Sequence, residues 1–578
     1  MLMKGRVFMG GKFQEENADQ EVKFALIHPA LEWKNKENNI QKLMILNEKA
    51  ASEGARIILN TEMAATGYSF AGSSEIAPLT EVIPGPTTER FGSIARKYHC
   101  YICIGLPEVD PGVGSLYNSA ALIGPDGEVI GKYRKVFPAF KENLWARKGN
   151  LPILVAETEY GKLGVIICAD AYSYKPPRIA ALKGARLLLI LANWPPHHHN
   201  PQDIWRARAV ENGIYILVCN RTGKDKTMNY IFAESFIIDN KGKIITRMQS
   251  AEDTIIYGTV PLVKGTFISS ADFILGQRQP ELYGKISLDT FSQPVPEALL
   301  SLPEPKLFGV ATVQFRPVAE KVEENRQKML ELIDRATAVA AQKGIELNLI
   351  LFPELAATGA ISDARKIQEL AEEIPGAGTA VFTEKAGENN VYIVLGIVEK
   401  QGVDYFNTAV LIGAEGMLGK YRKVHLTSQD KTWACAGKEG FPTFDLPFGR
   451  VAILIGYDLI FPESVECLAK WGTDLLCVPS LWGDEKSKFI WEARITEQMH
   501  LAIANQWGDS GDYQSLGESL IYSYSSYPEK RIRRKSPAAG DMINILTLNS
   551  KSTREKRFLE NIDYDIILGV TKREKIKT

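Results

Sequence analysis

Short apolar runs and amphipathic segments alternate along the first half of the chain. Residues 22–27 have the apolar pattern of a β-strand, whereas residues 38–54 place Ile40, Leu43 and Ala50 on one face, as an amphipathic α-helix does. Further apolar runs of strand length follow, several of them separated by helical segments, at residues 55–62, 99–107, 117–124, 163–167, 186–194 and 214–220. This alternation predicts an α/β fold.

Cys168 stands where one of these runs ends. Residues 163–167 are nearly all apolar, which is typical of a strand buried on both faces, and residues 178–184 have a helical pattern closed by a glycine. A thiol at such a strand end lies at the edge of a sheet, where a cation or amide groups can lower its pKa. The sequence therefore predicts a reactive, thiolate-prone Cys168, with a buried structural cysteine as the alternative.

The chain repeats itself. Four segments of the first half return in the same order in the second half, and such order indicates two copies of one domain. The pairs are ARIILNTEMAATGY (55–68) with NLILFPELAATGA (348–360), GKYRKVF (131–137) with GKYRKVH (419–425), GKLGVIICAD (161–170) with GRVAILIGYD (449–458), and WRARAVE (205–211) with WEARITE (491–497).

These repeats predict a four-part organisation. A polar N-terminal extension covers residues 1–21, a first domain covers 22–291, and a second domain covers 307–578. Residues 292–306 between them are rich in proline, which is typical of a stiff, extended linker.

Composition narrows the classes of function. At 578 residues the chain is too long for one hydrophobic core. A net charge of −1 does not favour a nucleic acid or an anionic membrane as partner. Seven scattered cysteines do not form a disulfide framework, and the Cys100–Cys103 pair has no second pair with which to hold zinc. Without a signal peptide or a long apolar stretch, we expect a reduced, cytoplasmic setting and no membrane contact.

The first half holds three groups that can attack a carbonyl or nitrile carbon. Glu62 follows a strand, Lys135 precedes a turn and Cys168 ends a strand. The carboxylate can take the thiol proton and later activate water, the ammonium group can stabilise an oxyanion, and the thiol can form the covalent intermediate. Because α/β sheets collect their chemistry at strand ends, we expect the three groups to converge.

The second half lacks the nucleophile. It keeps Glu354 and Lys423, but Gly456 stands where the first half has Cys168. Glycine has no side-chain atom that could attack carbon, so we expect a degenerate site at Glu354, Lys423 and Gly456, and no catalysis by residues 307–578.

The ordered set TEMAATGY, GKYRKVF, GVIICAD and RARAVEN resembles the carbon–nitrogen hydrolase (nitrilase) superfamily, and the resemblance covers nearly the whole chain twice. It implies that Glu62 is the general base, Lys135 the oxyanion-stabilising lysine and Cys168 the nucleophile. It also implies that Glu142 helps to orient the substrate and the lysine, with an ordinary surface glutamate as the alternative.

The resemblance also implies the architecture. Each half should be a four-layer αββα sandwich, and the two halves should pack as an intramolecular pseudo-dimer. A homo-oligomer built from such pseudo-dimers is the larger assembly that the family suggests.

The substrate is less narrowly defined. Ala169 and Asp170 follow Cys168 where true nitrilases usually have Trp-Glu, which is closer to the amidase and carbamoylase branches. We therefore predict thiol-dependent hydrolysis of a non-peptide C–N bond in a small amide or N-carbamoyl (ureido) substrate, through an acyl-enzyme on Cys168 and without a cofactor. The alternatives are a nitrilase acting on a nitrile and a non-catalytic ligand-binding or scaffold protein.

Tyr68, Asn193 and Trp194 are the candidate substrate contacts. Asn193 and Trp194 lie where, by the resemblance, the strand after the cysteine meets the acyl pocket, although Trp194 could equally be a core aromatic residue. The run His197–His199 suggests a metal, but neighbouring side chains on an extended loop point in different directions. We therefore expect no metal, and a pocket-rim loop at this place.

Overall fold

The computed structural model describes residues 20–196, 201–287, 301–495, 498–510, 513–525 and 530–554. Among these residues the chain divides into two compact units, an N-terminal unit that ends at Gln277 and a C-terminal unit that begins at Arg278. The histidine run at 197–199, residues 1–19 of the predicted N-terminal extension and residues 292–300 of the predicted linker lie outside the described residues.

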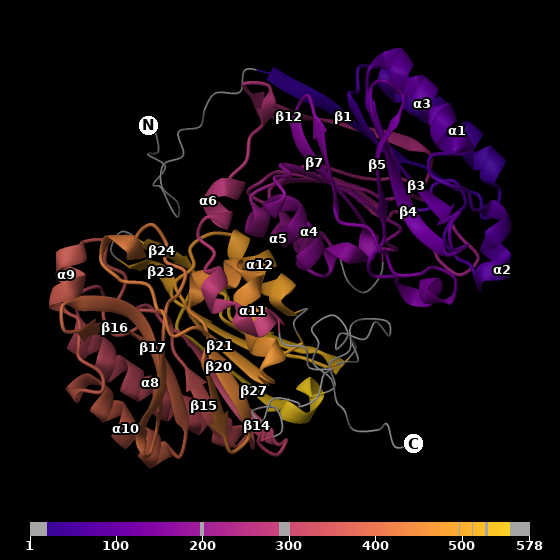
Figure 1. The fold of residues 1–578 in the computed structure, drawn as a ribbon. Helices are drawn as coiled ribbons and strands as arrows, with labels where there is room; N and C mark the ends of the chain where they lie inside the picture. The colour runs from indigo at the N-terminus through magenta and orange to yellow at the C-terminus, as the bar shows by residue number, and fades with distance from the viewer. Residues whose placement is uncertain are drawn as a thin grey trace. The chain divides into compact units, whose positions relative to one another are not determined.

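Two sheets form the centre of the N-terminal unit (Figure 1). The seven-stranded sheet has the order β13-β12-β1-β2-β3-β4-β5 and the six-stranded sheet the order β11-β10-β9-β8-β7-β6. Their strands are β1 (Gln20–His28), β2 (Ile57–Leu59), β3 (Tyr101–Val109), β4 (Leu116–Ile123), β5 (Val129–Arg134), β6 (Leu154–Thr158), β7 (Gly161–Ile167), β8 (Leu187–Leu191), β9 (Tyr215–Cys219), β10 (Glu234–Ile238), β11 (Ile244–Gln249), β12 (Thr254–Val263) and β13 (Thr266–Phe267).

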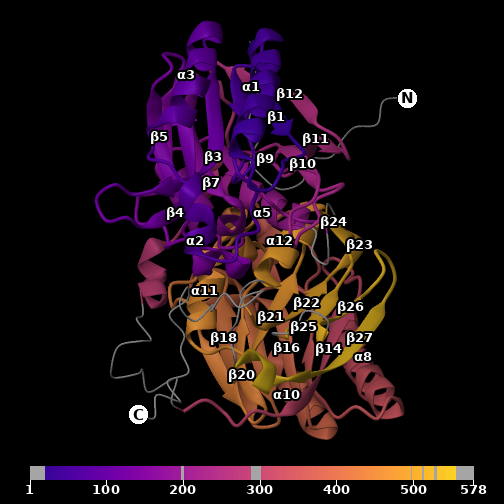
Figure 2. The same ribbon diagram turned by 90° about the vertical axis from the view of Figure 1, so that its right-hand side faces the viewer.

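Helices cover the outer face of each sheet. The long helices α1 (Lys36–Ser52) and α3 (Pro86–Tyr98) lie side by side on the first sheet (Figure 2), and α4 (Lys175–Leu182) and α5 (Gln202–Asn212) lie on the second. The inner faces of the two sheets share one apolar core, to which β1, β2, β7 and β8 all contribute. The shorter elements are α2 (Ser73–Ile76), η1 (Ala77–Leu79), η2 (Phe140–Leu144), η3 (Cys168–Ala171) and α6 (Ala271–Leu275).

The C-terminal unit repeats this plan. One sheet has the order β18-β17-β16-β15-β14-β27, the other has the order β19-β20-β21-β22-β25-β26, and β23 and β24 form a separate hairpin. The strands are β14 (Leu307–Gln314), β15 (Leu347–Leu351), β16 (Tyr392–Gln401), β17 (Asp404–Gly413), β18 (Gly416–Arg422), β19 (Thr443–Leu446), β20 (Gly449–Ile453), β21 (Leu475–Ser480), β22 (His500–Asn505), β23 (Trp507–Ser510), β24 (Tyr513–Leu516), β25 (Leu520–Ser523), β26 (Ile532–Lys535) and β27 (Met542–Asn549).

Helices α8 (Val322–Gln342) and α10 (Ala377–Asn389) cover the first of these sheets. Helices α11 (Pro462–Lys470) and α12 (Lys486–Arg494) follow β20 and β21 in the chain, as α4 and α5 follow β7 and β8. The remaining elements are η4 (Pro280–Leu282), η5 (Gly284–Ser287), α9 (Ala364–Glu369), η6 (Asp430–Thr432), η7 (Gly456–Ile460) and η10 (Ser550–Thr553). Both units therefore confirm the predicted α/β class and sandwich plan, while their pairing as a pseudo-dimer stays a prediction.

The division between the units falls earlier than the predicted domain end at residue 291. Residues 278–287 belong to the C-terminal unit because their side chains bond to it. Arg278 Nε donates to Glu463 Oε1 at 2.8 Å, and the Tyr283 hydroxyl lies 2.8 Å from His425 Nε2. The sequence pattern could not show this, because the contacts join residues far apart in the chain.

The loop that carries Glu62 lies against strand β3 at a glycine. A Cβ atom at Gly105 would lie 2.6 Å from the Thr61 carbonyl oxygen and 2.7 Å from the Met63 nitrogen. The second copy has the same close approach, since a Cβ at Gly396 would lie 2.7 Å from Glu354 Cα. A glycine here lets the loop pack directly on the neighbouring strand, which fixes the position of the Glu62 backbone relative to β3.

Gly105→Ala should therefore destabilise the N-terminal unit, because the added methyl group has only rigid backbone to displace. We expect a loss of about 1–3 kcal/mol in the free energy of unfolding, the usual range for overpacking, measured by chemical denaturation. Gly72→Ala is the matched control, since a Cβ there meets no atom within 4 Å. Equal stability of the two variants would show that the loop can move away from β3.

Candidate active site

Three strand ends of the N-terminal unit carry the predicted triad. Glu62 follows β2, Lys135 follows β5 directly, and Cys168 opens the short helix η3 after β7. Strands β2 and β3 are parallel, and two antiparallel pairings through β4 give β5 the same direction. The groups that follow β2 and β5 therefore lie at the same edge of that sheet.

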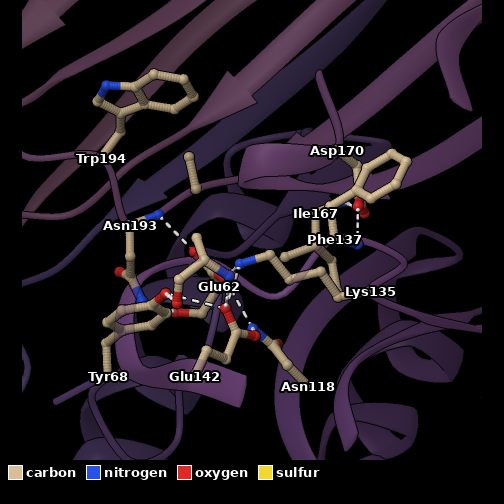
Figure 3. Close-up of polar contacts among 12 residues, drawn as sticks. Glu62, Tyr68, Asn118, Lys135, Phe137, Glu142, Ile167, Asp170, Asn193 and Trp194 are labelled. Carbon is tan, nitrogen blue, oxygen red and sulfur yellow. Dashed lines mark hydrogen bonds and ion pairs between the residues drawn. The ribbon is translucent and has the colours of Figure 1, made fainter. Parts of the chain in front are cut away.

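A buried lysine joins two carboxylates at this edge (Figure 3). Lys135 Nζ donates to Glu62 Oε1 at 2.6 Å and to Glu142 Oε2 at 2.7 Å. The side chains of Glu62 and Lys135 are fully buried, and Glu142 is 1% exposed. Glu142 is thus a member of the cluster, which excludes the alternative that it is an ordinary surface residue.

Two asparagines hold the Glu62 carboxylate in place. Asn118 Nδ2, from β4, donates to Glu62 Oε1 at 2.8 Å and to Glu142 Oε1 at 2.6 Å. The backbone N–H of Asn193 donates to Glu62 Oε2 at 2.9 Å, and its side chain donates to the Glu62 carbonyl oxygen at 2.9 Å. The sequence interpretation missed Asn118, although Asn407 occupies the matching place in the second copy and was the available signal.

The other two candidate substrate contacts have partners of their own. The Tyr68 hydroxyl donates to Glu142 Oε2 at 2.9 Å, so Tyr68 joins the charged cluster. The ring of Trp194 packs against Tyr172 and Trp205, with centroids 4.5 and 5.5 Å apart. Contact of Tyr68, Asn193 or Trp194 with a substrate stays a prediction.

Cys168 lies close enough to the charged cluster for Glu62 and Lys135 to influence its titration. Its side chain is nearly buried and its backbone has a positive φ of 44°, a strained conformation for a residue with a side chain. Strain of this kind is common where a strand end presents a functional group.

Burial decides the resting protonation of the thiol. Burial and the Glu62 charge raise the pKa of Cys168 well above its usual value, and Lys135 only partly opposes them. The expectation of a thiolate-prone cysteine is therefore wrong for the free protein. The reason is that two carboxylates already offset the Lys135 charge, while most of the thiol is removed from water.

Burial also raises the pKa of Glu62, helped by Glu142 and opposed by Lys135. For Lys135, burial favours loss of the proton, but the charges of Glu142 and Glu62 outweigh it and raise the pKa. The lysine is therefore a permanent cation, and Glu62 is a stronger base than an exposed glutamate. This combination suits a proton transfer from the Cys168 thiol to Glu62 at the moment of attack.

Asp170, two residues after the nucleophile, has a structural role. Its carboxylate accepts from the Tyr133 hydroxyl at 2.7 Å and from the Phe137 N–H at 2.9 Å, and burial raises its pKa to about 7. Figure 3 shows Asp170 beside Phe137 and Ile167, apart from the Glu62–Glu142 cluster. It ties the turn after β7 to the segment that carries Lys135.

The C-terminal unit builds the same cluster without a nucleophile. Lys423 Nζ donates to Glu354 Oε1 at 2.6 Å and to Asp430 Oδ2 at 2.8 Å. Asn407 Nδ2 bridges the two carboxylates, at 2.8 Å from Glu354 Oε1 and 3.1 Å from Asp430 Oδ1. Gly456 occupies the position of Cys168 at the start of η7.

The described residues hold neither a metal cluster nor a membrane-spanning helix. Within the residues that the structure describes, no group of three or more His, Cys, Asp or Glu side chains is arranged to hold a metal ion. No helix in the same ranges is long and apolar enough to cross a membrane.

The order in which the cysteines are labelled should depend more on their exposure to solvent than on their tendency to form a thiolate. Cys435 is the exposed cysteine, and the other six, including Cys168, are buried. One equivalent of iodoacetamide at neutral pH should therefore modify Cys435 first, as read by peptide mass spectrometry. Because the pKa of Cys168 is raised, its labelling in a Cys435→Ser chain should accelerate steadily as the pH rises above 8. Fast labelling of Cys168 that is independent of pH between about 6 and 9 would mean that the thiolate is already formed.

Known proteins are similar in sequence to each half of this chain. The family model for carbon-nitrogen hydrolase matches residues 23–267 and 309–525, which confirms the predicted tandem repeat. A nitrilase of Pyrococcus abyssi is 32% identical over 251 residues, and the match covers 43% of this chain and 92% of that protein. A citrullinase of Francisella tularensis is 30% identical over 273 residues, covering 44% of this chain and 93% of the relative.

The omega-amidase NIT2 of Mus musculus is 29% identical over 263 residues, covering 43% of this chain and 92% of that protein. Among solved structures, Nit3 of Saccharomyces cerevisiae matches with a TM-score of 0.39 at 24% identity, covering 42% of this chain and 91% of its own. Each of these relatives corresponds in length to one copy of the repeat. The family model matches both halves, and the two matches together cover most of the chain. The chain therefore belongs to the carbon–nitrogen hydrolase family.

Proposed function

We propose that the N-terminal copy hydrolyses a non-peptide C–N bond in a small amide or N-carbamoyl substrate, through an acyl-enzyme on Cys168. The observation that carries the proposal is the buried Lys135, bound by Glu62 and Glu142, beside a thiol at a strand end. A structural cysteine would not need a buried base and a buried cation as neighbours.

In the first half-reaction Cys168 Sγ attacks the carbonyl carbon, and the thiol proton passes to Glu62. The developing oxyanion lies next to Lys135. Its Nζ has three N–H groups and donates two of them to Glu62 and Glu142, so the third can donate to the oxyanion. The protonated Glu62 then gives its proton to the leaving nitrogen, and ammonia or an amine departs as the C–N bond breaks. A thioester between Cys168 and the acyl group remains.

In the second half-reaction Glu62 takes a proton from water, and the hydroxide attacks the thioester carbon. Collapse of the tetrahedral intermediate releases the carboxylic or carbamic acid and returns the proton to the sulfur. Glu142 and Asn118 keep Lys135 and Glu62 in position throughout, because Glu142 accepts from Lys135 and Asn118 donates to both carboxylates. We treat Glu142 as a positioning residue for the lysine.

Amide and ureido bonds are preferred over nitriles for two reasons. Ala169 and Asp170 after the nucleophile resemble the amidase and carbamoylase branches. Relatives with similar identity are named omega-amidase and citrullinase. A relative named nitrilase supports a nitrile as the second candidate. A panel of primary amides, N-carbamoyl amino acids and nitriles, with ammonia detection and identification of the acid product, separates the three.

Cys168→Ala should abolish turnover of any substrate found in this panel. Lys135→Ala removes the cation that faces the oxyanion and should lower kcat on the order of 10²-fold or more, as loss of an oxyanion-hole donor does. Glu62→Gln should block both half-reactions. Lys97→Ala and Glu157→Gln are matched controls at exposed positions and should keep normal rates. A folded Cys168→Ala protein with substantial turnover would disprove the mechanism.

A further inference from the structure

The C-terminal unit keeps a buried charged cluster although it has no nucleophile. Glu354, Lys423 and Asp430 are as tightly bonded as the three charged residues of the N-terminal site. Burying charges costs free energy even when they are paired. A cluster retained without chemistry therefore has a role in folding, in binding, or in both.

Two further positions differ between the copies around the missing thiol. Ser480 ends β21 where Ala192 follows β8, and Leu481 stands where the N-terminal unit has Asn193. The alignment is fixed by the next residue, because Trp194 and Trp482 each donate their backbone N–H to an asparagine side chain, Asn220 and Asn505. The C-terminal copy has thus lost the thiol at Gly456 and gained a hydroxyl group at Ser480.

Two oxygens lie next to the position that the Cβ atom of a nucleophile would take in this copy. A Cβ at Gly456 would lie 2.8 Å from Glu354 Oε2 and 3.4 Å from Ser480 Oγ. In the described part of the chain nothing donates to Glu354 Oε2, whereas Asn193 satisfies the matching oxygen of Glu62. Ser480 is fully buried, and its hydroxyl has no hydrogen-bond partner among the described residues.

Lys423 has a further N–H group beside Glu354. Its ammonium group has three N–H groups, and those given to Glu354 and Asp430 account for two. The site therefore offers one ammonium N–H group, one carboxylate oxygen and one hydroxyl group that can accept or donate. A primary carboxamide has the complementary set, a carbonyl oxygen and two N–H groups. An ammonium ion has donors but no acceptor, so it would leave the third N–H group of Lys423 without a partner.

We propose that the C-terminal copy binds a small primary carboxamide without cleaving it. The carbonyl oxygen accepts from Lys423, and the amino group donates to Glu354 Oε2 and Ser480 Oγ. The choice of ligand rests on the proposed function, because it is the substrate class of the N-terminal site. Solvent reaches the C-terminal cluster at least as well as the N-terminal one. The side chains of Glu354 and Asp430 are 4% and 7% exposed, against 0% and 1% for Glu62 and Glu142.

The experiment needs the full chain with the N-terminal site blocked. Cys435→Ser protein is alkylated at Cys168 with iodoacetamide at alkaline pH, and mass spectrometry confirms a single adduct. Propionamide, and the amide that the unmodified enzyme cleaves fastest, are then titrated by saturation-transfer NMR. We expect saturable binding to the alkylated chain. Ser480→Ala should weaken it about 3- to 10-fold, the effect of one lost hydrogen bond, and Glu354→Gln at least as much.

Thr473→Val is the matched control. Thr473 also has a buried hydroxyl without a partner among the described residues, but it lies at the opposite end of β21 from Ser480. Its removal should leave the dissociation constant unchanged.

The inference is overturned if the alkylated chain binds neither amide, if ammonium chloride binds and the amides do not, or if Ser480→Ala and Glu354→Gln bind as tightly as the parent. Ammonia release by the unmodified chain is measured separately. Cleavage of amides without binding to the alkylated chain would refute this inference alone. Binding without any amide cleavage would refute the proposed function alone.

Discussion

The contact on which each copy depends is a buried ammonium group held between two buried carboxylates. Lys135 bridges Glu62 and Glu142, and Lys423 bridges Glu354 and Asp430, at 2.6 to 2.8 Å in all four contacts. Removing one partner would leave an uncompensated buried charge, which is far more costly than the pair itself. The strand ends that supply these groups must therefore keep their spacing, and the shared apolar core between the two sheets fixes it.

Comparison of the copies shows how a substitution in the cluster is compensated. Asp430 is one methylene shorter than Glu142 and lacks a counterpart of Tyr68, because Ala360 stands at the end of the matching loop. Thr427 replaces Ala139 and donates both its backbone N–H, at 2.9 Å, and its hydroxyl, at 2.7 Å, to Asp430 Oδ2. The hydroxyl of Thr427 thus takes the place of the Tyr68 hydroxyl, and the carboxylate keeps its hydrogen bonds.

The α/β class and most of the cluster leave local signals in the sequence, whereas the sandwich plan and the role of Glu142 were implied by the family resemblance. Buried strands are apolar runs, and Glu62, Lys135 and Glu142 each lie in or beside a segment that repeats in order. Asn118 was missed because an asparagine within a strand has no distinctive local pattern, and its partners are 24 and 56 residues away. The high pKa of Cys168 was also missed, since it depends on how completely three other charges are buried and paired. Residues 278–287 join the C-terminal unit through contacts with groups that follow much later in the chain, which a local sequence pattern does not contain.

The two copies together separate assembly of the site from its chemistry. The C-terminal cluster forms with a glycine at the nucleophile position, so the thiol is not needed to hold the charges in place. A copy can therefore lose the cysteine without leaving a buried charge unpaired, whereas losing the lysine or a carboxylate would do so. This difference in cost accounts for a second copy in which the nucleophile is absent while its charged surroundings are intact. What such a copy retains is a set of oriented donors and acceptors, which is sufficient for recognition even where the reaction has been lost.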